Sequence, residues 1–289
     1  MHLNIFVSQQ CFLYCKGCYS FSREEKCNTC VSSDDLINFL DFAYKKGIKK
    51  VTLCGGDPLT RADIIDLLER IKKIGFSISM DTLGTSLIKD IKQNGKIIIK
   101  KTDVQKIATL VDMIGIPIDG SNNEIFKKFR QTESDIINEQ LSICAELHKH
   151  GANICINTVV HKGNLKDAEN LSKLINKMNY IKKWQMFKFA PLGKFGSMNR
   201  NLFEINDQEF IDFKNNVIKK YSGDSNMLDF KNSERRNKTY VLINNSGDAW
   251  IPFFEDGISD NCLYNQEESK MIGNITNKKN WEKICSYFI

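Results

Sequence analysis

The amino-acid sequence predicts an α/β protein built on a parallel sheet: a partial (β/α)6 barrel with a small C-terminal α+β appendage. Short runs of β-branched and apolar residues alternate with longer segments of helical spacing, which is typical of successive βαβ units. Several helical segments are followed directly by glycine, a common residue just after a helix. The alternation is lost after about residue 190, and this change predicts the appendage.

The expected elements follow in chain order. The strand at 3–7 is an apolar run that leads into a loop rich in cysteine. Ser33-Asp34-Asp35 supplies an N-cap and an acidic first turn for the next helix. Further strands are expected at 51–54, 76–80, 113–118, 153–160 and 184–189, and helices at 36–46, 61–74, 134–150 and 165–178. Six such units form an open, TIM-like barrel, whose site is expected at the carboxyl ends of the strands.

The second half of the chain follows a different pattern. It contains a helix at 207–220, a turn at 244–248 between two short strands, a further strand near the C-terminus and a last helix. These strands and the last helix are expected at 239–243, 249–253, 271–275 and 281–287. We therefore expect a barrel core at 1–190 and, at 191–289, a cap that lies against it.

Composition narrows the class of protein. Hydrophobic residues make up 42% and charged residues 26% of the 289 residues, so the chain is expected to be globular rather than disordered. There is no apolar run of roughly 20 residues and no cationic leader, so a cytoplasmic protein without membrane contact is expected. The net charge of +6 comes from lysines scattered along the chain, and no nucleic-acid partner is expected.

Five of the ten cysteines fall within the first 30 residues. Cys11, Cys15 and Cys18 have the spacing C-x3-C-x2-C directly after the first strand. Three thiolates in one loop can ligate three irons of a [4Fe–4S] cluster, and the fourth iron is left open to a chelating small molecule. The alternatives are a zinc site completed by Cys27 or Cys30, and core cysteines with no common ligand. Without a metal, Cys27 and Cys30 are expected to be a pair in a solvent-facing loop.

A second motif, Gly55-Gly56-Asp57-Pro58, ends the second strand. In this order after the cysteine loop, it resembles the corresponding segment of the radical S-adenosylmethionine (SAM) superfamily. The resemblance implies that Gly55, Gly56 and Asp57 hold SAM, which chelates the open iron. The reduced cluster then cleaves SAM to methionine and a 5′-deoxyadenosyl radical, which abstracts a hydrogen atom from a substrate. It also implies an external one-electron donor such as flavodoxin or ferredoxin.

Weaker candidates follow from position along the barrel. Residues at strand ends could reach SAM, although polar residues there are more often turn or cap residues. These cofactor-binding candidates are Tyr19, Thr82, Asp119, Ser121, Arg130 and Asn157. The candidates for a catalytic role are Cys54, Cys155 and Tyr240.

The sequence around the last cluster cysteine departs from the superfamily pattern. Gly17 stands where most members carry an aromatic residue, and Tyr19 follows the cysteine. This arrangement resembles the activating enzyme of anaerobic ribonucleotide reductase, which makes a glycyl radical on a partner protein. That enzyme is much shorter and has no counterpart to the second half of this chain.

The C-terminal tail of the sequence indicates a class of substrate. It resembles the SPASM/twitch-like tail of peptide-modifying members, but Phe253 and Phe254 stand where an auxiliary-cluster cysteine is usual. Downstream of them only Cys262 and Cys285 remain. The leading expectation is therefore a peptide substrate, as in post-translational modification of a ribosomally made peptide.

The layout also resembles viperin-like enzymes, which act on nucleoside triphosphates. Two of their triphosphate-binding lysines are replaced here by Cys155 and Gln185, and Lys188 or Lys194 could substitute. A nucleotide or other small metabolite is therefore the alternative substrate. Activation of a glycyl-radical enzyme is a further alternative, and an iron–sulfur or zinc scaffold without catalysis is the last.

Overall fold

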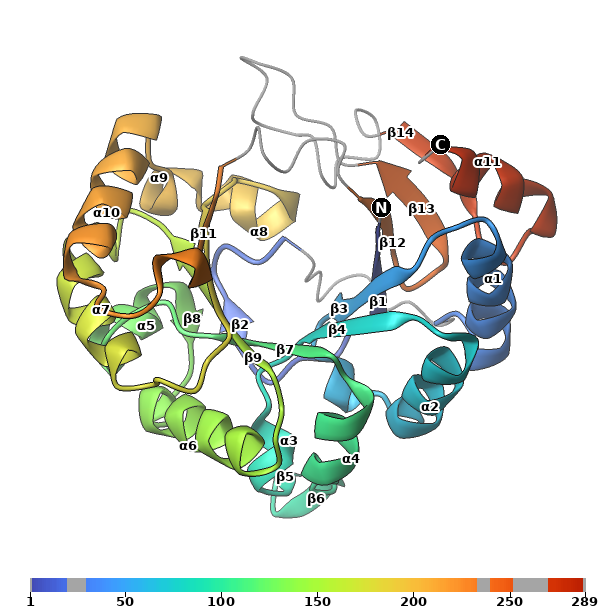
Figure 1. The fold of residues 1–289 in the computed structure, drawn as a ribbon, viewed down its shortest axis with the longest axis horizontal. Coiled ribbons are helices and arrows are strands. Elements are labelled where there is room, and N and C mark those ends of the chain that lie inside the picture. Colours follow the sequence, from blue (N-terminus) through green and yellow to red (C-terminus); the bar gives the residue numbers. More distant parts are fainter. Residues whose placement is uncertain (1, 20–29, 233–239, 252–269, 288–289) are drawn as a thin grey trace.

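A ten-stranded sheet curves through the protein, and helices cover its outer face (Figure 1). The computed structural model describes residues 2–19, 30–232, 240–251 and 270–287. The strands are β1 (His2–Ser8), β2 (Tyr14–Cys15), β3 (Lys50–Gly55), β4 (Ser77–Asp81), β5 (Ile91–Gln93), β6 (Lys96–Ile99), β7 (Met113–Pro117), β8 (Arg130–Gln131), β9 (Ile154–Val160), β10 (Lys183–Lys188), β11 (Leu228–Lys231), β12 (Val241–Ile243), β13 (Asp248–Ile251) and β14 (Lys270–Asn274). The helices are α1 (Ser33–Lys45), α2 (Ile64–Ile74), α3 (Thr85–Ile88), α4 (Val104–Leu110), α5 (Asn123–Phe129), α6 (Ile136–Lys149), α7 (Ala168–Asn176), α8 (Gly193–Met198), α9 (Arg200–Phe203), α10 (Asp207–Lys220) and α11 (Trp281–Ser286).

The six predicted strands of the barrel are confirmed as a parallel array. The sheet order is β11-β10-β9-β7-β4-β3-β1-β12-β13-β14, and every pairing from β11 to β12 is parallel. The sheet does not close, because its two ends are formed by β11 and β14. The predicted open α/β barrel is therefore correct.

The C-terminal part of the chain continues the same sheet. β12 pairs in parallel with β1, and β13 and β14 follow in antiparallel order. At the opposite end of the sheet, β11 pairs in parallel with β10. The sequence patterns did not predict β11. Residues 252 and 253, the end of a predicted strand, lie outside the described residues.

Local sequence explains where the helices begin and end. α1 begins after Ser32, whose hydroxyl accepts a hydrogen bond from the Asp35 N–H, so the N-cap is one residue before the expected position. α2 ends at Gly75, which has the left-handed φ of 109° that glycine adopts without strain. Asn206 and Glu209 form a reciprocal capping box at the start of α10.

Successive side chains of each strand point to opposite faces, and the two faces differ in chemistry. The outward residues join a large apolar core with the helices, in which Trp184 of β10 and Phe39 of α1 are fully buried. The inward set of the central strands is rich in polar residues, among them Asp81, Asn157 and Gln185. The inner face can therefore bind a polar ligand, while the outer face stabilises the fold.

Among the described helices, none has both the length and the apolar character that crossing a membrane requires. The cytoplasmic location stays a prediction from the sequence.

Candidate cluster and cofactor site

The structure brings the three cysteines of the C-x3-C-x2-C loop together beyond the carboxyl end of β1. Cys15 is buried in β2, which pairs with β8 so that Cys15 lies opposite Arg130. Cys11 and Cys18 are half-buried, and the Cys18 N–H donates to the Cys15 carbonyl at 3.2 Å. A negative charge on Cys18 would raise the pKa of both Cys11 and Cys15, so the three side chains lie close enough to act on one another.

The surroundings of the loop favour the protonated thiol form of Cys11 and Cys15 over the thiolate form when no cation is bound. Burial, followed by the charge of Asp57, raises the pKa of Cys11 to about 12. Burial raises the pKa of Cys15 as well, against the lowering effect of Arg130, whose Nη1 donates to the Cys15 Sγ at 3.7 Å. A bound metal cluster would supply the positive charge that three thiolates in this place need.

The donor set fits a cluster better than a single ion. Within the described ranges, no group of three or more His, Cys, Asp or Glu side chains is arranged to hold one metal ion. Each cysteine of a [4Fe–4S] cluster binds a different iron, so its ligands stand further apart than those of one zinc ion. Three cysteine side chains in one loop are the donor type that a [4Fe–4S] cluster takes, so the chemistry of the residues present fits that cluster.

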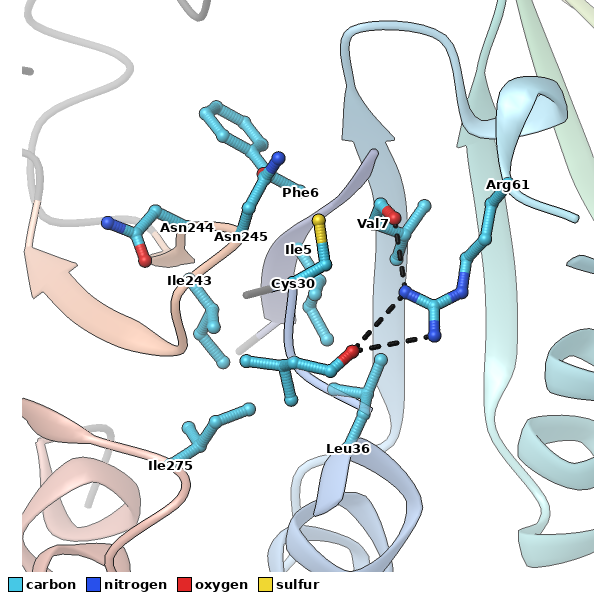
Figure 2. A pocket seen from close by; sticks show the side chains of 11 residues that line it. Ile5, Phe6, Val7, Cys30, Leu36, Arg61, Ile243, Asn244, Asn245 and Ile275 are labelled. Atoms are coloured by element: carbon cyan, nitrogen blue, oxygen red, sulfur yellow. Dashed lines mark hydrogen bonds between the residues drawn. The ribbon is translucent and has the colours of Figure 1, made fainter. Parts of the chain in front are cut away.

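Cys30 lies elsewhere, in a gap between β1, α1 and the turn after β12 (Figure 2). Its neighbours there include Ile5, Val31 and Arg61, which donates to the carbonyl groups of Val7 and Val31. Cys30 is exposed. Cys27 lies outside the described residues.

The two glycines of Gly55-Gly56-Asp57 allow a close backbone contact with the cysteine loop. The Gly56 N–H donates to the Ser8 carbonyl at 2.6 Å, and the Asp57 N–H donates to the Gln10 carbonyl at 2.7 Å. A Cβ on Gly56 would lie 2.2 Å from the Gln10 oxygen, and Gly55 has a φ of 125°. The resemblance implied that this motif holds SAM; the structure shows that it also fixes the position of the loop that starts at Cys11.

Asp57 holds the turn from inside. Its side chain is buried and accepts hydrogen bonds from Leu59 N–H (3.0 Å), Thr82 Oγ1 (2.5 Å) and Leu83 N–H (3.1 Å). Burial raises its pKa, and these hydrogen bonds oppose that rise. The side chains of Asp57 and Thr82 therefore bind each other, and both are buried.

The space beside Gly17 is filled by aromatic rings from other elements. A Cβ on Gly17 would lie 2.4 Å from the ring of Phe129 and 2.8 Å from that of Phe189. Tyr19 is 42% exposed, and its ring lies 6.0 Å from that of Phe6. The missing aromatic residue at position 17 thus has a packing reason, which the sequence alone did not reveal.

Arg130 and Asp119 form an ion pair beneath the loop. Asp119 is fully buried and also accepts from the Val159 N–H at 2.7 Å. Asp119 therefore acts by positioning Arg130, which contacts Cys15. Ser121 donates through its N–H and its hydroxyl to Asp167, at 2.6 and 2.7 Å, so both groups are engaged within the protein.

Asn157 reaches across the barrel wall to Asp81. Its Nδ2 donates to Asp81 Oδ1 at 2.7 Å, over the intervening strand β7. Gly115 makes this contact possible, because a Cβ there would lie 2.0 Å from Asp81 Oδ1 and 2.5 Å from Asn157 Nδ2. Asp81 is exposed to solvent, yet its surroundings in the barrel raise its pKa through lost solvation.

The three catalytic candidates lie in two places. Cys54 is buried with Phe6 and Leu242, and Tyr240 packs against this group. Cys155 is buried in β9, where its Sγ lies 3.6 Å from Asn157 Oδ1. The structure does not bring the three side chains into one cluster.

Sequence reasoning missed several residues that the fold places at the site. Gly115 could have been noticed as a glycine within a strand, a common sign of close approach. His161 stacks on Phe129 with ring centroids 5.0 Å apart, and Lys231 of β11 reaches Gln185. Neither has a motif that would have marked it.

Comparisons with known proteins point to one family for this chain. The family model described as the Radical SAM superfamily matches residues 5–175. The chain is 21% identical over 252 residues to an S-adenosylmethionine-dependent nucleotide dehydratase of Flammeovirga pacifica, which covers 85% of this chain and 80% of that protein. It is 27% identical over 202 residues to a GTP 3′,8-cyclase of Limosilactobacillus fermentum, which covers 66% of this chain and 55% of that protein.

Solved structures share the fold. The SAM-bound structure of SuiB from Streptococcus suis superposes with a TM-score of 0.68 at 16% sequence identity. The match covers 98% of this chain and 65% of the SuiB chain, so this chain spans a little under two thirds of that protein.

Proposed function

The chain belongs to the radical SAM superfamily, and on this basis we propose that Cys11, Cys15 and Cys18 ligate its [4Fe–4S] cluster. Members of this superfamily are enzymes that use SAM and such a cluster. When bound and reduced, the cluster and SAM supply a carbon radical that removes a hydrogen atom from the substrate. The observation that supports the ligand assignment is that the three cysteines act on one another electrostatically beside Arg130, which contacts Cys15.

The residues around the loop prepare this site. Gly55 and Gly56 let the turn after β3 pack on the backbone before Cys11, and Asp57 keeps the turn in shape. We propose that SAM binds between this turn and the inward-facing residues near the carboxyl ends of β4 and β9. Asp81 and Asn157 present polar groups there, and Phe129 and Phe189 exclude water from the side of Gly17.

We propose a nucleotide as the substrate. Two features support it over a peptide: the polar inner face of the barrel, and the sequence likeness to a nucleotide dehydratase over most of both chains. A nucleotide offers hydroxyl, base and phosphate groups to such a face. A peptide, the first expectation from the sequence, keeps the support of a fold likeness to SuiB bound to its precursor peptide, at 16% identity. Phe253, Phe254 and Cys262 lie outside the described residues. Cys285, a residue of α11, is buried in the apolar core.

The absence of lysines at positions 155 and 185 counted against a nucleoside triphosphate as the substrate. Another lysine of the structure weakens this objection. Lys188 is engaged by Asp207 at 2.7 Å. Lys231, which comes from the unpredicted strand β11, places its Nζ 2.8 Å from Gln185 Oε1. A cation is therefore present beside Gln185 although neither of the two positions is a lysine.

Anaerobic reconstitution tests the cluster. The wild type should hold about four irons per chain with broad absorbance near 400 nm, and the Cys11→Ala, Cys15→Ala and Cys18→Ala variants should lose both. Stoichiometric zinc without iron would refute the assignment.

Turnover tests the reaction and the substrate. With dithionite and SAM the wild type should release 5′-deoxyadenosine, and a nucleoside triphosphate should raise the rate while a peptide should not. S-adenosylhomocysteine as the product would instead indicate methyl transfer. A natural donor of the flavodoxin or ferredoxin type should replace dithionite.

A further inference from the structure

Two lysines on the inner face of the barrel share one carboxylate. Lys183 Nζ lies 2.8 Å from Asp229 Oδ2, and Lys231 Nζ lies 3.6 Å from the same oxygen. In the described parts of the chain, no other carboxylate is within ion-pair distance of either ammonium group. Asp229 therefore serves two ammonium groups, and its contact with Lys231 is the longer of the two.

The strand register places Lys231 on the inner face. β11 pairs with β10 so that Asp229 lies opposite Gln185 and Lys231 lies opposite Phe187. The outward neighbour Phe230 packs against Phe210 of α10, so Lys231 points the other way.

The Lys231 ammonium is held in place by two contacts. Its Nζ donates to Gln185 Oε1 at 2.8 Å and lies 5.1 Å from the centre of the Phe187 ring. The positive charge of Lys231 acts to lower the pKa of Cys155 in β9, Asp81 in β4 and His2 in β1. These residues belong to three other strands of the barrel. The Lys231 side chain is 29% exposed, and burial lowers its pKa. The charges of Asp229 and Asp81 oppose that lowering, and a bound phosphate would stabilise the ammonium group further.

We propose that Lys231, positioned by Gln185 and Asp229, binds a phosphate group of the small-molecule substrate inside the barrel; this rests on the proposed function. An ammonium group has three donors, and only one of them is taken by a hydrogen bond of normal length. The Asp229 contact, at 3.6 Å, is too long for a hydrogen bond, so the ammonium group can donate to a phosphate oxygen without losing Gln185.

The position in the sheet suits a group with several charges. β11 is the last strand on its side of the described sheet, so Lys231 lies at a sheet edge, where its side chain keeps partial exposure to solvent. A chain of phosphates could contact Lys231 at one oxygen while the rest stays in water, which avoids the cost of burying every charge. This geometry favours a phosphate chain over an uncharged substrate.

Equilibrium binding to the reconstituted holoenzyme with SAM provides the test. The probes are inorganic triphosphate, each of the four nucleoside triphosphates and the matching nucleosides. The variants are Lys231→Met, which keeps length but removes charge, and Lys231→Arg, which keeps charge. Lys188→Met serves as the matched control, because Lys188 comes from the neighbouring strand and is engaged by Asp207.

The expected result is a loss of at least about tenfold in triphosphate affinity in Lys231→Met, equal to about 1.4 kcal/mol. Lys231→Arg should stay within about threefold of wild type, and Lys188→Met should match it. The affinities for SAM and for nucleosides should be the same in all proteins. Lys231→Gln replaces Lys231→Met if the methionine variant melts at a lower temperature than the control.

The outcomes separate the two proposals. Equal triphosphate affinity in wild type and Lys231→Met would overturn the phosphate site, even where a triphosphate speeds 5′-deoxyadenosine release. Triphosphate binding that depends on Lys231, without any gain in turnover, would support the site and refute the nucleotide as substrate. Weakened SAM binding in Lys231→Met would overturn the proposal by placing Lys231 at the cofactor.

Discussion

Replacing Gly56 by alanine should detach the cysteine loop from the turn that supports it. The added Cβ would lie 2.2 Å from the Gln10 oxygen and 2.7 Å from the carbonyl carbons of Gln9 and Gln10. These are backbone atoms, so no side-chain rotation can relieve the contact. The two backbone segments have to separate, and Cys11, the next residue after Gln10, has to move with them.

The cost follows from the contacts that would be lost. Two backbone hydrogen bonds, Gly56 N–H to Ser8 and Asp57 N–H to Gln10, are worth about 1 kcal/mol each. Overpacking adds about 1 to 3 kcal/mol. The sum of about 3 to 5 kcal/mol is an upper bound for the loss in unfolding free energy, because the loop can move without opening the barrel.

The assay compares iron content with global stability. Gly56→Ala should unfold cooperatively in denaturant but bind well below four irons per chain after reconstitution. Gly47→Ala is the control: it strains a left-handed glycine at the end of α1, where no atom lies within 4 Å, at a cost of about 1 kcal/mol. Full iron content with unchanged stability in Gly56→Ala would refute the packing argument.

Three further substitutions test the surroundings of the site. Arg130→Met should cost about 3 to 5 kcal/mol in denaturant unfolding and lower the iron content, because a buried carboxylate loses its partner and Cys15 loses a donor; iron content equal to wild type would contradict this role. Burial lowers the pKa of His161 to about 4, so the unfolded chain takes up its proton at higher pH than the folded protein. The unfolding free energy should therefore fall by about 3 kcal/mol between pH 6.5 and pH 4, and His161→Leu should lack that part of the slope. Gly115→Ala should destabilise the protein by about 2 kcal/mol, because its Cβ collides with the hydrogen bond from Asn157, and adding Asn157→Ala should restore part of the loss in a double-mutant cycle.

The barrel could be predicted because its strands and helices are encoded locally. Apolar β-branched runs such as Val51–Leu53 of β3, and glycines such as Gly75, give signals that need no partner strand. The cysteine loop and the Gly55–Asp57 turn could be predicted for the same reason. Both are short motifs, placed at the ends of the first two barrel strands.

The rest depends on contacts between distant residues. β11 alternates apolar and polar residues over only four positions, which is too short a pattern to mark a strand, so its pairing with β10 is what identifies it. The contact of Arg130 with Cys15 joins residues 115 positions apart. Gly17 looked like a departure from a motif, and only the position of Phe129 explains it. No pattern within one segment carries this information.

The outer face of the sheet is apolar and the inner face is polar, and this separation explains how a stable protein can have a polar site. Trp184 of β10 is fully buried on the outer face, and its indole N–H donates to Thr158 Oγ1 at 2.9 Å. The next residue, Gln185, faces the interior and contacts Lys231. Because adjacent residues belong to different faces, the apolar layer that stabilises the fold is separate from the layer that meets the substrate. The inner layer can therefore carry polar and charged side chains without disturbing that apolar layer.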